Sequence, residues 1–122
     1  MAVSVLLVED EVLVSRLIAD RLSERGFAVH EAASGEEAMH VLDSGERVDV
    51  LFTDVNLPGG MDGGQLARKA RQQRPELPVV YTSGRVSYGE IGPLVPRSIF
   101  LAKPYDPDDL ATLLDRLTAA QQ

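Results

Sequence analysis

Short apolar runs alternate with amphipathic segments along the whole chain. Four runs are rich in Val, Leu or Ile and have the length of buried strands, and a fifth is weaker. They are Val3–Val8, Val48–Phe52, Val79–Tyr81 and Ile99–Ala102, with Phe27–His30 as the weaker run. Runs of this kind are typical of strands buried on both faces of a parallel sheet. We therefore predict five strands in one such sheet.

Most segments between these runs have helical spacing and recognisable ends. Gly26 is a natural C-cap for the first helix, and Ser34 with Glu37 forms a capping-box pattern for the second. Arg74-Pro75 ends the third helix, and Asp106-Pro107 opens the last with Pro at its first position. We expect the apolar stripes to face the core. In chain order they are Val14, Leu17, Ile18 and Leu22; Ala38, Val41 and Leu42; Leu66, Ala67 and Ala70; and Leu110, Leu113, Leu114 and Leu117. This alternation predicts an α/β domain with helices on both faces of the sheet.

Length and composition narrow the class of protein. A chain of 122 residues with 44% hydrophobic residues suits one globular domain, so we expect residues 1–122 to form a single domain. The net charge of −7 argues against a nucleic-acid-binding domain, and the lack of cysteine excludes disulfides and thiolate metal sites. The N-terminus has no basic region and only a short apolar run, so we expect no signal peptide, no membrane span and a cytoplasmic location.

Acidic and polar residues follow four of the predicted strands. Glu9-Asp10-Glu11 follows the first, Asp54 the third, Thr82-Ser83 the fourth and Lys103-Pro104 the fifth. Ligands of such sheets bind beyond the carboxyl ends of the strands, so these residues should converge. Crowded carboxylates repel one another unless a cation neutralises them, and carboxylate and carbonyl oxygens suit Mg²⁺. Singly, each residue is more typical of a helix cap or a turn; together they predict a site for Mg²⁺ and a phosphoryl group.

Five motifs, in order, give the chain a resemblance to a known family. They are Glu9-Asp10, Thr53-Asp54-Val55-Asn56-Leu57-Pro58, Met61-Asp62-Gly63, Thr82-Ser83-Gly84 and Lys103-Pro104-Tyr105. With them the chain resembles, over essentially its whole length, the receiver domain of two-component response regulators. The resemblance implies a flavodoxin-like, doubly wound, five-stranded parallel sheet with strand order 2-1-3-4-5.

The resemblance also implies a chemistry for the acidic residues. Asp54 would be the nucleophile that takes a phosphoryl group from a phosphohistidine on a sensor histidine kinase or a histidine phosphotransfer protein. Asp10 and Asp54 would coordinate Mg²⁺, with Glu9 acting through water and Asn56 offering its backbone carbonyl. Glu11 would start the following helix.

A conformational switch follows from the same resemblance. Lys103 would pair with the phosphoryl group, and Thr82 would move its hydroxyl onto a phosphoryl oxygen. Phe100 occupies the position of the family's switch aromatic, although a simple core aromatic would look the same in the sequence. The change would be transmitted to a protein partner that the sequence does not identify.

Three features affect how closely this chain is expected to match the usual structure of the family. The loop Pro58–Gly63 is one residue longer than the commonest family form and resembles receivers attached to hybrid kinases. The segment from Arg85 to Arg97 should hold the family's fourth helix but contains Gly89, Gly92, Pro93 and Pro96, so we expect that helix to be short or irregular. We expect the Lys103–Pro104 bond to be cis.

Four interpretations remain open at this stage. The chain ends just after its last predicted helix, which favours a stand-alone signalling switch with no attached DNA-binding output. The long loop keeps a receiver from a hybrid kinase open. An Mg²⁺-dependent phosphatase would need an acid two residues after Asp54, where Asn56 stands. A constitutive binding module would need a broken site, yet Asp10, Asp54, Thr82 and Lys103 are all present.

Overall fold

The computed structural model describes residues 2–84 and 94–119, and these form a five-stranded parallel sheet with helices on both faces. The strands are β1 Ser4–Val8, β2 Ala28–Ala32, β3 Val50–Asp54, β4 Val79–Ser83 and β5 Ser98–Ala102. The helices are α1 Val12–Glu24, α2 Gly35–Asp43, α3 Gly63–Gln73 and α4 Pro107–Thr118. The strand order is β2-β1-β3-β4-β5, which confirms the predicted fold.

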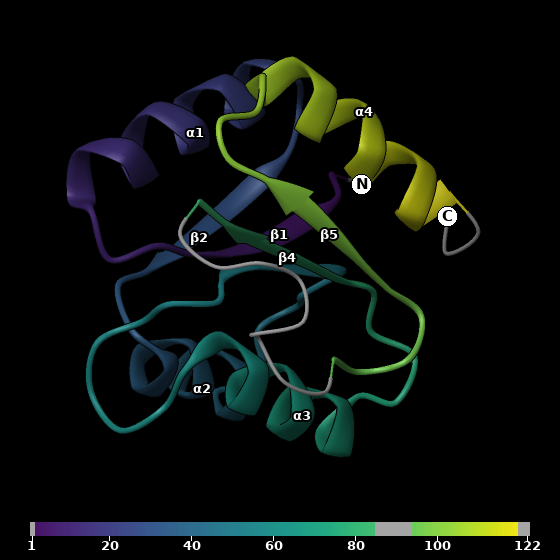
Figure 1. Ribbon diagram of the computed structural model, residues 1–122. Helices are drawn as coiled ribbons and strands as arrows, with labels where there is room; N and C mark the ends of the chain where they lie inside the picture. Colours follow the sequence, from purple (N-terminus) through teal and green to yellow (C-terminus); the bar gives the residue numbers. More distant parts are fainter. Residues whose placement is uncertain (1, 85–93, 120–122) are drawn as a thin grey trace.

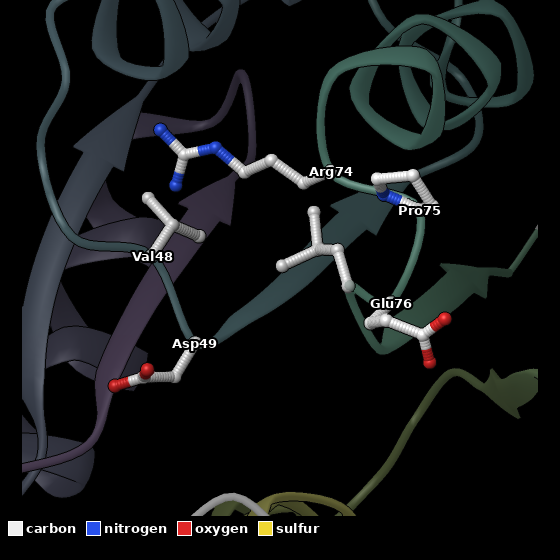
Figure 2. Close-up of a pocket in the computed structure, with 6 residues that line it drawn as sticks. Val48, Asp49, Arg74, Pro75 and Glu76 are labelled. Carbon is white, nitrogen blue, oxygen red and sulfur yellow. The ribbon is translucent and has the colours of Figure 1, made fainter.

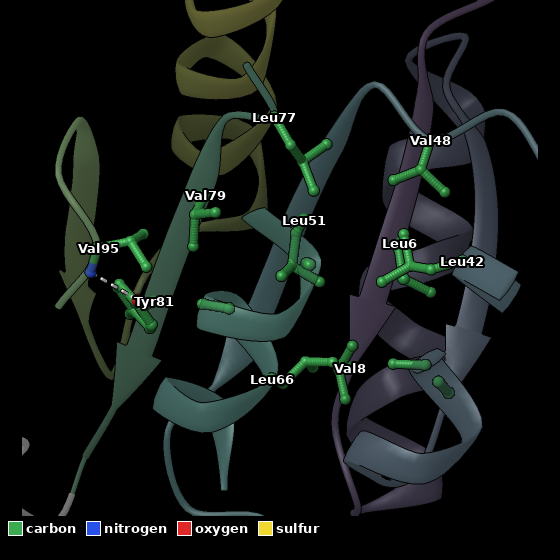
Figure 3. Packing of buried hydrophobic residues seen from close by; sticks show 14 of the residues in the cluster. Leu6, Val8, Leu42, Val48, Leu51, Leu66, Leu77, Val79, Tyr81 and Val95 are labelled. Carbon is green, nitrogen blue, oxygen red and sulfur yellow. Dashed lines mark hydrogen bonds between the residues drawn. The ribbon is translucent and has the colours of Figure 1, made fainter. Parts of the chain in front are cut away.

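The sheet separates two layers of helices and two hydrophobic clusters. Helices α1 and α4 lie on one face, and α2 and α3 lie on the other (Figure 1). Strand β1 contributes residues to both clusters. Val5 and Leu7 point to the α1–α4 side, while Leu6 and Val8 point to the α2–α3 side. Figure 3 shows Leu6 and Val8 in the cluster on the α2–α3 side, together with Leu51 of β3. Burial on both faces explains why β1 reads as an unbroken apolar run.

The predicted helix ends agree with the structure in most details. Asp106 caps α4 with Pro107 at its first position, and Gly26 follows α1 with a φ of +94°. Ser34 caps α2 by accepting from the Glu37 amide. The return bond of a capping box does not form at Ser34, because the Glu37 carboxylate accepts from the Ala33 amide instead.

The prediction that the whole stripe of α1 faces the core is wrong at Leu17. The buried positions of α1 are Ser15, Ile18, Ala19 and Leu22, at spacings of three and four, whereas Leu17 is 67% exposed. Successive helical residues are separated by about 100°, so Leu17 points away from the face that Ile18 buries.

The helix expected within Arg85–Arg97 falls largely on residues 85–93, which lie outside the described residues. The following residues, 94–97, are not helical. They are held in place by contacts with β4 and α3: the Val95 amide donates to the Tyr81 hydroxyl at 3.2 Å (Figure 3). The Arg71 guanidinium donates to the carbonyls of Pro96 and Arg97 at 2.7 and 3.0 Å.

The prediction of a cis Lys103–Pro104 bond is confirmed. Within residues 2–84 and 94–119 no helix combines the length and the apolar character that crossing a membrane requires.

Candidate functional site

The carboxyl ends of β1, β3 and β5 bring four charged side chains together. Glu9 and Asp10 follow β1, Asp54 ends β3, and Lys103 follows β5. One carboxylate oxygen from each of the three acids, which we call the acidic cluster, lies within 4.8 Å of the others. The Lys103 ammonium contacts Asp54 Oδ2 at 2.7 Å and Glu9 Oε1 at 3.1 Å. The predicted convergence at one edge of the sheet is therefore present.

Asp54 is almost fully buried and is held on several sides. Its side chain is 8% exposed, and its Oδ1 accepts from the Asn56 amide at 2.9 Å. Its carbonyl oxygen accepts from the Thr53 hydroxyl at 2.9 Å. The next amide, that of Val55, donates to the Thr82 carbonyl of β4 at 2.9 Å. These contacts fix the position and orientation of the Asp54 carboxylate.

The electrostatics of the site tie Lys103 to the two buried acids. Burial raises the pKa of the Glu9 carboxyl, and the charge of Asp54 adds to the increase, while the Glu11 amide and Lys103 oppose it. Partial burial alone would lower the pKa of Lys103, but its hydrogen bonds to Asp54 and Glu9 outweigh this and raise it. Lys103 therefore stays protonated and neutralises part of the excess negative charge.

The residues present suit a hard divalent cation. The acidic cluster offers oxygen ligands only, and two of its members, Glu9 and Asp54, are buried while Asp10 is exposed. A hollow beside it is lined by Asp10, Asp54, Asn56, Gly84 and Lys103, together with Glu11. Oxygen ligands at an open edge, with room for water, match the preference of Mg²⁺. The acidic cluster is thus capable of binding a metal.

The hydroxyl groups at the end of β4 point to different partners. The Thr82 hydroxyl donates to the Leu101 carbonyl of β5 at 2.6 Å. The neighbouring Ser83 hydroxyl accepts from the Asn56 side-chain amide at 3.1 Å. Sequence reasoning placed Thr82 and Asn56 at the site but gave Ser83 no role, since a motif does not reveal which of two adjacent hydroxyls faces which neighbour.

Phe100 lies on β5 opposite Tyr81 of β4 and is half-buried. It packs against the hydrophobic cluster under α2 and α3, together with Leu94. This position is compatible with both alternatives left open by the sequence, a switch aromatic and a core aromatic. Glu11 is the N-cap residue of α1, as predicted, and its amide donates to Glu9 Oε2 at 3.0 Å.

Next to the site, α1 exposes an apolar patch that sequence reasoning missed. Val12, Leu13 and Leu17, which we call the α1 patch, are 67%, 80% and 67% exposed. A groove beside it is lined by Leu17 and by Lys103-Pro104-Tyr105. The signal was the excess of apolar residues at the start of α1, which exceed what one helical face can bury.

Another hollow lies at the opposite edge of the sheet, before β3 and β4. Figure 2 shows Val48, Asp49, Arg74, Pro75 and Glu76 around it. Its charged groups already have partners: Asp49 accepts from the Ser4 amide, and Arg74 donates to the Leu42 and Glu46 carbonyls. Among the residues that the structure describes, the acidic side chains close enough together to hold a metal lie at the carboxyl edge and not in this hollow.

Comparison with known proteins agrees with this geometry. The sequence profile of the family described as "Response regulator receiver domain" matches residues 5–115. The chain is 36% identical over 121 residues to "Sensor kinase CckA" of Brucella abortus, a match that covers 97% of this chain and 13% of the kinase. It is 34% identical over 116 residues to "Sensor protein EvgS" of Escherichia coli K12, covering 93% of this chain and 10% of that protein. The chain spans about a tenth of the length of these relatives.

Two solved structures are similar to this chain over nearly its whole length. A response regulator receiver protein from Sinorhizobium medicae superposes with a TM-score of 0.89 at 36% identity, over 99% of this chain and 98% of that one. The receiver domain of the hybrid histidine kinase CckA superposes with a TM-score of 0.81 at 35% identity, over 94% of this chain and 98% of that domain.

Proposed function

Because the chain belongs to the family of response regulator receiver domains, which are signalling switches, we propose that it is the phosphoacceptor of a two-component phosphorelay. In this proposal residues 1–122 form one receiver domain, and Asp54 takes up the phosphoryl group. The observation that carries it is the buried Asp54 carboxylate, 2.7 Å from Lys103 and inside the acidic cluster.

The donor is a phosphohistidine on a sensor histidine kinase or a histidine phosphotransfer protein. An Asp54 carboxylate oxygen attacks phosphorus while the phosphorus–nitrogen bond breaks, and the bonding electron pair returns to the imidazole, which takes up a proton. Asn56 holds Asp54 Oδ1 through its backbone amide, which leaves the Lys103 ammonium beside Oδ2. Lys103 then pairs with the transferred phosphoryl oxygens.

Asp10, Asp54 and the Asn56 carbonyl would hold Mg²⁺, with Glu9 beside them. Bound there, Mg²⁺ would neutralise charge on the phosphoryl oxygens and on the crowded acids. The oxygen-only ligand set and the raised pKa of Glu9, whose main cause is burial, support this assignment, because a cation would relieve the cost of ionising that carboxyl.

Output begins at Thr82. Its hydroxyl now donates to Leu101 of β5, and in the phosphorylated state it donates to a phosphoryl oxygen instead. The Leu101 carbonyl loses that donor next to Phe100, so β5 and the Phe100 ring repack. A local charge thereby biases two packing arrangements, which a downstream protein partner distinguishes.

The donor docks through the α1 patch. An apolar patch exposed beside the site is typical of a surface that binds another protein, and the adjoining groove reaches Lys103. A partner helix that carries the phosphohistidine fits this arrangement, since the apolar side chains along one face of a helix can pack into an apolar groove.

A second candidate is a receiver that acts as part of a hybrid kinase. The similarity to "Sensor kinase CckA" and to the CckA receiver favours it, whereas the similarity to the Sinorhizobium medicae protein favours a stand-alone receiver. The length of the natural gene distinguishes the two candidates.

The test uses acetyl phosphate and Mg²⁺ with intact-mass detection. The parent chain and the surface control Asp20→Asn should each gain one phosphoryl group, and Asp54→Asn should gain none. Normal uptake by Asp54→Asn would contradict the proposal.

A further inference from the structure

The start of α3 packs against the backbone of Asp54 with no room for a side chain. A Cβ added at Gly63 would lie 2.2 Å from the Asp54 carbonyl oxygen, 2.9 Å from the Val55 Cα and 3.0 Å from the Asp54 carbonyl carbon. All three neighbours are backbone atoms, which cannot turn aside as the end of a side chain can. We propose that Gly63 is a positioning residue for phosphoryl transfer, because the absence of a side chain there sets the place of the Asp54 nucleophile and of the loop that follows it.

The backbone on the Asp54 side of this contact is pinned. The Asp54 carbonyl accepts from Thr53, and the Val55 amide donates to the Thr82 carbonyl of β4. The Asp54–Val55 peptide therefore cannot retreat from an added methyl group without loss of a hydrogen bond.

Helix α3, on the other side of this contact, is also held in place. Leu66, Ala67 and Ala70 of α3 are completely buried against the sheet. The Gly63 amide donates to the Val55 carbonyl at 2.9 Å, which closes the loop that carries Asn56. A retreat of α3 would break this bond and release the loop.

A shift of the Asp54–Val55 peptide or of α3 would displace the groups of the site by a predictable amount. An ordinary contact needs about 3.4 Å, so the 2.2 Å separation must grow by about 1 Å. Misplacement of a reacting group by that distance can lower the rate about 100-fold. Backbone conformation is no obstacle, because Gly63 is not among the glycines with positive φ, and Ala is the better helix former.

The neighbouring glycine provides a matched control. A Cβ at Gly64 would meet Asp62 Oδ1 at 3.3 Å and an Arg68 guanidinium nitrogen at 3.4 Å, both ends of side chains that can shift slightly. Gly63→Ala and Gly64→Ala thus add the same methyl group to the same helical turn, and only the first presses on Asp54.

The inference rests on the proposed function, and the experiment separates the two. The rate of phosphorylation by acetyl phosphate at saturating Mg²⁺ and the dissociation constant for Mg²⁺ are measured for the parent, Gly63→Ala and Gly64→Ala. We expect Gly63→Ala to react about 100-fold more slowly and to bind Mg²⁺ at least 10-fold more weakly, with Gly64→Ala close to the parent. If the parent itself takes no phosphoryl group, the proposed function fails, while the Mg²⁺ comparison still tests Gly63.

Stability is followed by circular dichroism in the same samples, with sucrose added if Gly63→Ala is only partly folded. A folded Gly63→Ala with the parent's rate and Mg²⁺ affinity would overturn the inference. So would a chain that stays unfolded in sucrose with Mg²⁺ and beryllofluoride, because Gly63 would then be needed for folding as a whole rather than for the site. Equal losses in both variants would also overturn it.

Discussion

Lys103 neutralises part of the charge of two buried acids, and its removal should lower the free energy of unfolding by a measurable amount. Lys103→Met deletes the ammonium that lies 2.7 Å from Asp54 and 3.1 Å from Glu9 while keeping most of the aliphatic stem. The side chains of Asp54 and Glu9 are only 8% and 3% exposed, so two buried charges lose their partner. Removal of one member of a buried ion pair costs about 3–5 kcal/mol. Since Lys103 is 30% exposed and Glu9, with its raised pKa, can take up a proton, we expect the lower end, about 3 kcal/mol.

The assay is urea unfolding at pH 7, with EDTA or with Mg²⁺. In EDTA the free energy of unfolding of Lys103→Met should fall by about 3 kcal/mol. Mg²⁺ should stabilise the variant more than the parent, because Lys103 no longer competes for the same carboxylates; a ligand at 100 times its dissociation constant adds about 2.7 kcal/mol. Lys69→Met, a change to the other lysine of the sequence on the exposed side of α3, should match the parent in both conditions. Equal stability of Lys103→Met and the parent in EDTA, or a difference that Mg²⁺ leaves unchanged, would refute the reasoning.

Three further variants test the switch, the docking surface and the anchor of the segment before β5. Thr82→Ala should still take up phosphate from acetyl phosphate at Asp54, but amide NMR shifts in β5 on phosphorylation should shrink; shifts as large as the parent's would argue against the switch. Replacement of Leu13 and Leu17 by Asp should slow transfer from a cognate phosphohistidine donor at least 10-fold, yet leave acetyl phosphate unaffected; equal loss with both donors would point to a damaged site. Tyr81→Phe deprives the Val95 amide of its acceptor and should lower the free energy of unfolding by about 1–3 kcal/mol in urea, whereas no change would show that water replaces the hydroxyl.

Much of the fold follows from local rules. Val5 to Val8 are buried on alternating sides of the sheet, so an unbroken apolar run was a reliable sign of a central strand. Caps such as Asp106-Pro107 mark helix starts because their chemistry is local. Leu17 was wrongly assigned to the core because spacing identifies a helix but does not fix how the helix is rotated against the sheet.

The site residues were predictable as a group, whereas their contacts were not. Strand ends of a parallel sheet meet at one edge, so the convergence of Asp54 and Lys103 followed once the strands were placed. The bond between Asn56 and Ser83 and the close approach of Gly63 to Asp54 depend on side-chain rotamers and tenths of an ångström. No pattern of hydrophobic and polar residues carries that information.

The central claim is that the acidic cluster, with Mg²⁺, makes Asp54 able to hold a phosphoryl group. Beryllofluoride, which mimics that group on a carboxylate, tests it directly when its binding is followed by fluorine NMR in a titration with Mg²⁺. The account predicts a bound fluorine signal that appears only with Mg²⁺ and disappears in Asp54→Asn. A bound signal without Mg²⁺, or one that persists in Asp54→Asn, would contradict it.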